Sequence, residues 1–250
     1  MRSFRADLHI HSVLSPCGGL EMAPSAVVNK LKENGVEWFA ITDHNSMANC
    51  PAYQAAAQRV GLHFSWGVEI QSMEEIHLLA YFEDSGKAQA FDRELYKSLL
   101  PLANDPDYFG DQVIIDENEN ILRVESRALI NSSIWDLTTA VEQVLAYDGF
   151  VIPAHIDAGV NSIISQLGFL PPYPEFDVLG ITARLDLTDY LGHNPGLSSK
   201  QFMRASDAHY LSDLGHAYSL IHVAEPSVTE LILASHKVGG RYIDSVQNIE

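Results

Sequence analysis

Apolar and polar residues alternate near the start of the chain, as is typical of a strand with two different faces. The apolar face consists of Phe4, Ala6, Leu8 and Ile10. The opposite face carries Asp7, His9 and His11, and the two histidines project to the same side, about 7 Å apart along the strand. Burial of such a polar face needs a compensating partner, and a metal ion is the best candidate.

Further along, apolar runs that end in turn residues alternate with segments of helical periodicity. The predicted strands are 36–42, 63–70, 76–82, 149–154, 177–182, 201–205 and 218–223. The predicted helices are 24–34, 51–60, 86–103, 133–147, with a serine available as N-cap, and 226–237. Alternating strands and helices indicate a parallel sheet, and about seven repeats favour a barrel over an open sheet.

The alternation of strands and helices breaks between residues 106 and 132. Two short apolar runs, 112–116 and 121–124, flank the polar segment 117–120, which predicts a small inserted hairpin. The sequence contains no internal repeat and no linker-like stretch. We therefore expect a single domain over residues 1–250, with the insertion at about 106–132.

Composition narrows the class of protein. The 250 residues are 46% hydrophobic and 19% charged, as in an ordinary soluble globule, and the formal charge is −18. This charge disfavours long nucleic acid as a partner, but a small anionic substrate remains possible because bound cations dominate the local field. There is no signal-peptide pattern, no apolar run long enough to cross a membrane, and no disulfide framework from Cys17 and Cys50, so we expect a cytoplasmic protein.

Residues that can bind metal recur near the predicted strand ends, where barrels collect their reactive groups. They are His11, His44, Glu69, His155, Asp207 and His209. His9, His77 and, as a possible soft ligand, Cys17 extend this set. Imidazole and carboxylate suit Zn²⁺, Mn²⁺ and Fe²⁺, and this many ligands exceeds the need of one open site, so we expect two or three ions, with Glu69 able to bridge two of them.

Six short motifs, in order, resemble the PHP (polymerase and histidinol phosphatase) domain of metal-dependent phosphoesterases. They are Asp-Leu-His-Ile-His-Ser at 7–12, Thr-Asp-His at 42–44, Gly-Val-Glu at 67–69, His-Leu-Leu at 77–79, Pro-Ala-His at 153–155 and Ser-Asp-Ala-His at 206–209. The resemblance implies a distorted (β/α)7 barrel that holds up to three metal ions.

The resemblance also implies how the ligands are shared. One ion would be held by His9, His11, Glu69 and Asp207, a second by Glu69, His77 and His155, and a third by His44, His209 and the residue at position 17. Several relatives have His or Asp at that position, and this chain has Cys17. A thiolate there would favour zinc, whereas an unligated loop thiol would leave the third ion weak or absent.

Two other candidate residues each have two possible roles. Asp43 either orients a ligand or its loop, or caps a helix. Arg184 follows the sixth predicted strand and either clamps a phosphate or forms a surface ion pair. The expected catalytic residues are Asp207, His209, Glu69 and Arg184, while Asp207, His209 and a metal-bound water all remain possible general acids.

These observations predict an enzyme, a metal-dependent phosphoric ester hydrolase. A metal-activated hydroxide at a di- or trinuclear centre would attack a small phosphomonoester or nucleotide. One alternative is an exonuclease that acts on short oligonucleotides. The other is a non-catalytic, metal-binding regulatory module.

Overall fold

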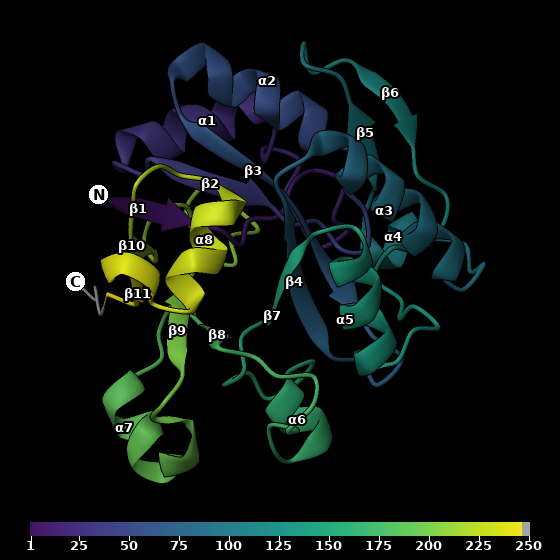
Figure 1. Ribbon diagram of the computed structural model, residues 1–250. Helices are drawn as coiled ribbons and strands as arrows, with labels where there is room; N and C mark the ends of the chain where they lie inside the picture. The colour runs from purple at the N-terminus through teal and green to yellow at the C-terminus, as the bar shows by residue number, and fades with distance from the viewer. Residues whose placement is uncertain (247–250) are drawn as a thin grey trace.

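The computed structural model describes residues 1–246 as a curled sheet with helices packed around it (Figure 1). In spatial order the strands of this seven-stranded sheet are β11 (Tyr242–Asp244), β10 (Ser219–Val223), β1 (Arg2–Asp7), β2 (Trp38–Ile41), β3 (His63–Gln71), β4 (His77–Phe82) and β7 (Phe150–Pro153). A separate parallel pair consists of β8 (Val178–Ile181) and β9 (Gln201–Arg204). Among residues 1–246, no helix combines the length and apolarity that a membrane span needs.

The β8–β9 pair closes a barrel between β7 and β1. The Ile156 N–H, just after β7, donates to the Gly180 carbonyl of β8 at 2.8 Å. At the other side, the His11 N–H donates at 2.9 Å to the carbonyl of Ala208, which follows β9. The ring therefore runs β1-β2-β3-β4-β7-β8-β9, and the distorted (β/α)7 barrel predicted from the sequence is confirmed.

The prediction that the sheet is parallel is wrong for β4 and β10. Strand β4 pairs antiparallel with both β3 and β7, and β10 pairs antiparallel with β1 and β11. The physical reason at β4 is the short loop after Gln71, because a parallel crossover needs about a dozen residues or more. This reversal brings the start of β4, with His77, beside the end of β3.

The helices follow the predicted pattern with different ends. They are α1 (Pro24–Glu33), α2 (Cys50–Val60), α3 (Ser85–Ser98), α4 (Pro106–Phe109), α5 (Leu137–Ala146), α6 (Ile163–Leu167), α7 (Leu187–His193) and α8 (Val228–Ser235). Helix α3 is shorter than predicted because Leu99 turns extended and forms a bridge with Ser133. The cap of α5 is Asp136 and not a serine, since its carboxylate accepts from the Thr139 N–H at 2.7 Å. Helices α4, α6 and α7 and strand β11 were not predicted.

The predicted hairpin is present as the antiparallel strands β5 (Val113–Ile115) and β6 (Ile121–Val124). It is attached to the barrel through the buried side chain of Asn49, at the start of α2. The Asn49 Nδ2 group donates to the Val113 carbonyl, and its Oδ1 accepts from the Ile115 N–H, both at 3.0 Å. The loop between β2 and α2 therefore connects the inserted hairpin to the barrel.

Buried apolar residues form two clusters. The larger one contains apolar side chains of α1, α2, α3 and α5 with the sheet residues that face them. The second joins Phe4, Trp38, Tyr81 and Met203 to Leu231 of α8. Ile10 belongs to the larger cluster although Phe4, Ala6 and Leu8 belong to the second. Strand β1 ends at Asp7, so the predicted alternation of faces does not continue as far as Ile10.

Candidate metal centre

Side chains from both ends of the sequence meet in one cavity of about 230 Å³ at an end of the barrel. Its lining consists of His11, His44, Glu69, His77, His155, Asp207 and His209, together with Ala158, Val160, Asn161 and Thr182. His9 is buried, 3% exposed, and is not part of the lining, but its Nε2 lies within 3.3 Å of carboxylate oxygens of Glu69 and Asp207. The structure thus brings together the histidines and carboxylates that the sequence singled out.

Glu69, on β3, lies at the centre of this arrangement with only 1% of its surface exposed. Its Oε1 lies 3.0 Å from the His77 Nδ1 and 3.1 Å from the His155 Nε2. Its Oε2 lies 3.1 Å from the His44 Nδ1. Both oxygens therefore face imidazole nitrogens from different segments of the chain, which is the arrangement that a bridging carboxylate requires.

Asp207 faces Glu69 across the pair formed by His9 and His11. The Asp207 Oδ1 lies 3.2 Å from the Nε2 atoms of both histidines. These nitrogens lie 3.2 Å from each other and 3.3 and 3.4 Å from the oxygens of Glu69. The two side chains, expected about 7 Å apart along a regular strand, instead converge on one point because β1 has already ended.

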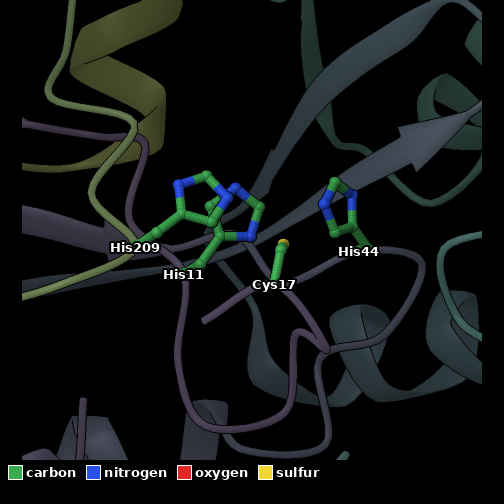
Figure 2. A group of neighbouring side chains, drawn as sticks. All are labelled: His11, Cys17, His44 and His209. Atoms are coloured by element: carbon green, nitrogen blue, oxygen red, sulfur yellow. The ribbon is translucent and has the colours of Figure 1, made fainter. Parts of the chain in front are cut away.

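A third group of ligand atoms joins His11, Cys17, His44 and His209, all within 4.8 Å of one another. Figure 2 shows the Cys17 sulfur between the rings of His11 and His44. The His209 ring stacks on the His11 ring with centroids 4.3 Å apart. Cys17 therefore lies beside three potential metal ligands, where its thiolate could bind a metal ion.

A chain of hydrogen bonds fixes the orientation and the tautomer of the His11 ring. The Ser15 hydroxyl donates to Asp43 Oδ1 at 2.7 Å, so it accepts from the His11 Nδ1–H at 2.8 Å. Asp43 is held in turn by the N–H and hydroxyl of Ser12, at 2.7 and 2.6 Å. The lone pair of His11 Nε2 is therefore directed into the cavity, and of its two expected roles Asp43 has the orienting one.

The ligand atoms fit a metal cluster better than a hydrogen-bond network. The Nδ1 atoms of His44 and His77 are buried and make no hydrogen bond with any residue among 1–246, although each lies about 3 Å from a Glu69 oxygen. Ligands around tetrahedral zinc, with bonds of about 2.0 Å, are separated by about 3.3 Å. The spacings of 3.0–3.4 Å around Glu69 match this value, so the residues fit bound ions.

The electrostatics of the cavity also favour cation binding. Burial opposes charge on Glu69, but the facing imidazoles of His77, His9 and His44 outweigh it and hold its pKa well below the usual range. The same competition lowers the pKa of Asp207, where His9 and His11 supply the positive field. Burial lowers the pKa of His44, which keeps that imidazole in the neutral, ligating form.

Several cavity residues have strained backbone conformations. His155, Asn161 and Asp207 have positive φ angles of 25°, 56° and 51°. Each such non-glycine conformation costs about 1–3 kcal/mol, and such residues cluster at functional sites. Here the sharp turn after β7 directs His155 into the cavity, and the turn after β9 does the same for Asp207.

The structure does not bring Arg184 to the cavity. Its side chain is exposed and is absent from the cavity lining. The buried guanidinium nearby belongs to Arg204, which donates to the carbonyls of Thr182, Ala183 and Leu185 at 2.8–2.9 Å. Arg204 thereby fixes the loop after β8 that places Thr182 at the cavity.

Sequence reasoning missed the non-ligand lining of Ala158, Val160, Asn161 and Thr182. Their only sequence signal is position, since they follow the strands that end near His155 and Ile181. Asn161 has an additional structural role, because its carbonyl accepts from the His77 N–H at 2.9 Å.

Comparison with known structures supports the barrel assignment. Endonuclease Q from Pyrococcus furiosus is 18% identical, with a TM-score of 0.67 over 96% of this chain and 57% of that one. A complex of endonuclease Q with duplex DNA carrying an abasic lesion gives 17% identity and a TM-score of 0.71, over 96% and 58%. An amidohydrolase from Chromobacterium violaceum is 18% identical, with a TM-score of 0.54 over 84% and 90%. The chain thus spans little more than half of the endonuclease Q chains.

Sequence comparison identifies the family. A PolC-type DNA polymerase III from Lacticaseibacillus paracasei is 32% identical over 80 residues, which are 32% of this chain and 6% of that protein. The PHP domain family model matches residues 7–162, which is more than half of the chain and contains five of the six motifs. The resemblance seen in those motifs is confirmed: this chain belongs to the PHP domain family.

Proposed function

We propose that this chain is a metal-dependent phosphoesterase that hydrolyses a small phosphomonoester or nucleotide. The observation that carries the proposal is Glu69, a buried carboxylate whose two oxygens face imidazoles from four different segments. Such a carboxylate would hold two ions at once. Bound together, the ions would lower the pKa of an attacking water and neutralise the oxygens of the phosphate.

The proposed ligand sets follow the distances around the cavity. His9, His11, Glu69 and Asp207 would hold one ion, Glu69, His77 and His155 a second, and His11, Cys17, His44 and His209 offer atoms for a third. The metals best suited to these nitrogen, oxygen and sulfur donors are Zn²⁺, Mn²⁺ and Fe²⁺.

The chain's own residues also have roles in binding and proton transfer. The His209 Nδ1–H donates to the Asp207 carbonyl at 2.7 Å, which leaves the Nε2 lone pair available to bind an ion or accept a proton. Asn161 and Thr182 supply the neutral polar groups of the lining, and Ala158 and Val160 supply an apolar edge. Among residues 1–246, no lysine or arginine lines the cavity, so the ions would provide the positive charge for the phosphate.

The substitution Asp207→Asn tests this proposal. Asparagine keeps the shape of the side chain and tolerates positive φ, so the fold should be retained. We expect elemental analysis to show loss of bound metal, and turnover of phosphomonoesters to fall by at least about 100-fold. The matched control is Asp189→Asn, an exposed carboxylate on α7 outside the cavity, which should change neither quantity. Full turnover by metal-free protein would contradict the proposal.

A second candidate function is hydrolysis of nucleic acid. The endonuclease Q structures, one of them with lesion-containing duplex DNA, align with nearly the whole of this chain, and this likeness argues against excluding long nucleic acid. The formal charge of −18 favours the small substrate. A panel of phosphomonoesters, phosphodiesters, short oligonucleotides, abasic duplex and an amide, each with Zn²⁺, Mn²⁺ and Fe²⁺, distinguishes the two functions. No turnover of any member by metal-loaded protein would instead support a non-catalytic regulatory module.

A further inference from the structure

A second cavity, of about 320 Å³, lies outside the metal centre between helix α3 and the inserted hairpin. Helix α3 contributes Arg93, Tyr96 and Lys97, and the hairpin side contributes Arg123 and Glu125. Ser46, from the loop between β2 and α2, forms part of its wall. Three cationic side chains around one cavity are unusual in a chain with 15 basic and 33 acidic residues.

The acidic groups of this cavity already have donors. Glu125 is 7% exposed, and its Oε1 accepts from the Tyr96 hydroxyl at 3.0 Å and from the Arg127 N–H at 2.9 Å. The Oδ1 of Asp92 accepts from the Met47 N–H at 2.7 Å. Burial raises the pKa of Asp92 to about 6, although the nearby charges of Arg123 and Arg93 oppose this shift. The hydrogen bonds that hold these two carboxylates therefore come from groups other than the cavity's cations.

The cationic groups, in contrast, keep unused hydrogen-bond capacity. The charge of Arg93 acts on the neighbouring Asp92 carboxyl and lowers its pKa, but within residues 1–246 the Arg93 guanidinium makes no hydrogen bond. The Arg123 Nη2 lies 3.6 Å from Glu125 Oε2, too far for a hydrogen bond. In the described part of the chain Lys97 pairs only with Glu94, one turn away, and this pair is weak because the two side chains are 69% and 41% exposed. The unsatisfied groups of the cavity are thus donors, and their complement is an anion.

The lining of this cavity is also partly apolar, and its aromatic ring is fixed by two contacts. The Tyr96 ring is held by the Arg127 guanidinium, 4.3 Å from its centroid, and by its own hydroxyl bond to Glu125. Ala48 adds a further apolar group to the lining. We propose that this cavity binds a small phosphorylated compound, with the phosphate on Arg93, Lys97 and Arg123 and the body of the ligand against Tyr96.

The position of the cavity relates it to the metal centre. Its residues Ser46 and Ala48 follow His44 directly along the β2–α2 loop. The neighbouring Asn45 and Met47 anchor that loop, through bonds to the Leu129 carbonyl at 2.8 Å and to Asp92. A bound phosphate compound would therefore contact the same loop that carries His44.

Calorimetric titration of the metal-loaded protein tests the proposal with two probes, inorganic phosphate and the phosphonate analogue of AMP, in which a methylene group prevents hydrolysis. We expect two binding events in the wild type, one at the metal centre and one at the second cavity. The double variant Arg93→Ala/Arg123→Ala should retain the first event and weaken the second by about tenfold or more. Tighter binding of the phosphonate than of phosphate would identify a phosphate ester as the ligand, and equal binding would identify free phosphate.

The matched control is Lys87→Ala, which removes an exposed cation from the same helix outside the cavity and should leave both events unchanged. Arg93 and Arg123 are exposed, so we expect an unchanged melting temperature in the double variant, and the single variant Arg93→Gln gives an independent measurement. The proposal is overturned if the wild type shows binding at the metal centre alone, or if the double variant keeps both events at wild-type affinity.

Discussion

The hydrogen bond between His11 and Ser15 shows how one hydroxyl determines the chemistry of a neighbouring residue. The sequence predicted His9 and His11 as a pair because their types and spacing are visible in the residues themselves. The contribution of Ser15 was not predictable, since its hydroxyl acts through a loop whose path depends on Asp43 from the next strand. The positive φ angles of His155 and Asp207 are equally absent from residue types.

Cys17 provides a prediction about metal preference. A serine hydroxyl binds zinc far less well than a thiolate, so Cys17→Ser should lower the zinc content by about one ion per chain. We expect the ions around Glu69 to remain, as measured by elemental analysis after growth with limiting zinc. Cys50→Ala, at a buried cysteine outside the cavity, should keep the wild-type content. Unchanged zinc in Cys17→Ser would show that Cys17 is not a ligand.

Asp92 provides a prediction about pH and stability. Burial raises its pKa to about 6 from a usual value near 4, so the folded protein binds this proton more tightly than the unfolded chain. The stability contribution of Asp92 therefore falls as pH rises from about 4 to about 6. Asp92→Asn keeps the acceptor for the Met47 N–H and should be more stable at pH 7 by about 1–2 kcal/mol, allowing for partial solvent screening.

Urea unfolding of Asp92→Asn and wild type at about pH 4.5 and 7 measures this effect, because the difference between the two proteins cancels the other titrating groups. The gain from the substitution should be small at the lower pH and larger at the higher one. An equal difference at both values would mean that Asp92 has an ordinary pKa in the folded protein.

At the scale of elements, the hydrophobic pattern predicted where most strands and helices lie but not the direction of β4. A fully buried strand is apolar along its whole length, so its composition does not indicate whether it runs parallel or antiparallel to its neighbours. The short loop between Gln71 and His77 was the usable signal, because it cannot hold a crossover helix. Helices α6 and α7 were not predicted because they are short, and so few residues show little helical periodicity.

The attachment of the hairpin to the barrel gives a prediction at this scale. Asn49→Ala removes the donor to the Val113 carbonyl and the acceptor for the Ile115 N–H, and both groups would stay buried without partners. We expect a loss of about 2–4 kcal/mol in the free energy of unfolding, measured in urea, together with faster proteolysis within residues 106–132. Asn118→Ala, in the exposed turn of the same hairpin, should change neither. Wild-type stability in Asn49→Ala would show that the hairpin is held by other contacts.

At the scale of the whole molecule, barrel closure explains why residues about two hundred positions apart share one cavity. The sequence could predict that His11 and Asp207 belong to one centre only through the barrel, since no local pattern links them. Closure places the end of β9 against the segment after β1, at the bond between His11 and Ala208. The net charge of −18 is also a property of the whole molecule, and it repels anions that approach the cavity.

Salt dependence follows from that charge. A small phosphoester makes one or two phosphate contacts, so its affinity should change by less than about tenfold between about 50 and 200 mM salt. An oligonucleotide bound through six to ten contacts would instead lose about 10³–10⁵ over the same range. Equilibrium binding across this salt series, with metal-loaded protein, measures the slope. A steep slope with tight oligonucleotide binding would favour nuclease activity over the small substrate.

The reversed strand β4 has a consequence for how the protein selects its own strand register. Glu69 and His77 lie on the two arms of a single hairpin, in which Gln71 pairs with His77 and Glu69 with Leu79. A slip of one residue would turn every side chain of one arm to the opposite face, so His77 would leave the cavity. Ions bound between these arms would therefore stabilise the correct register alone, so metal binding would favour correct strand pairing.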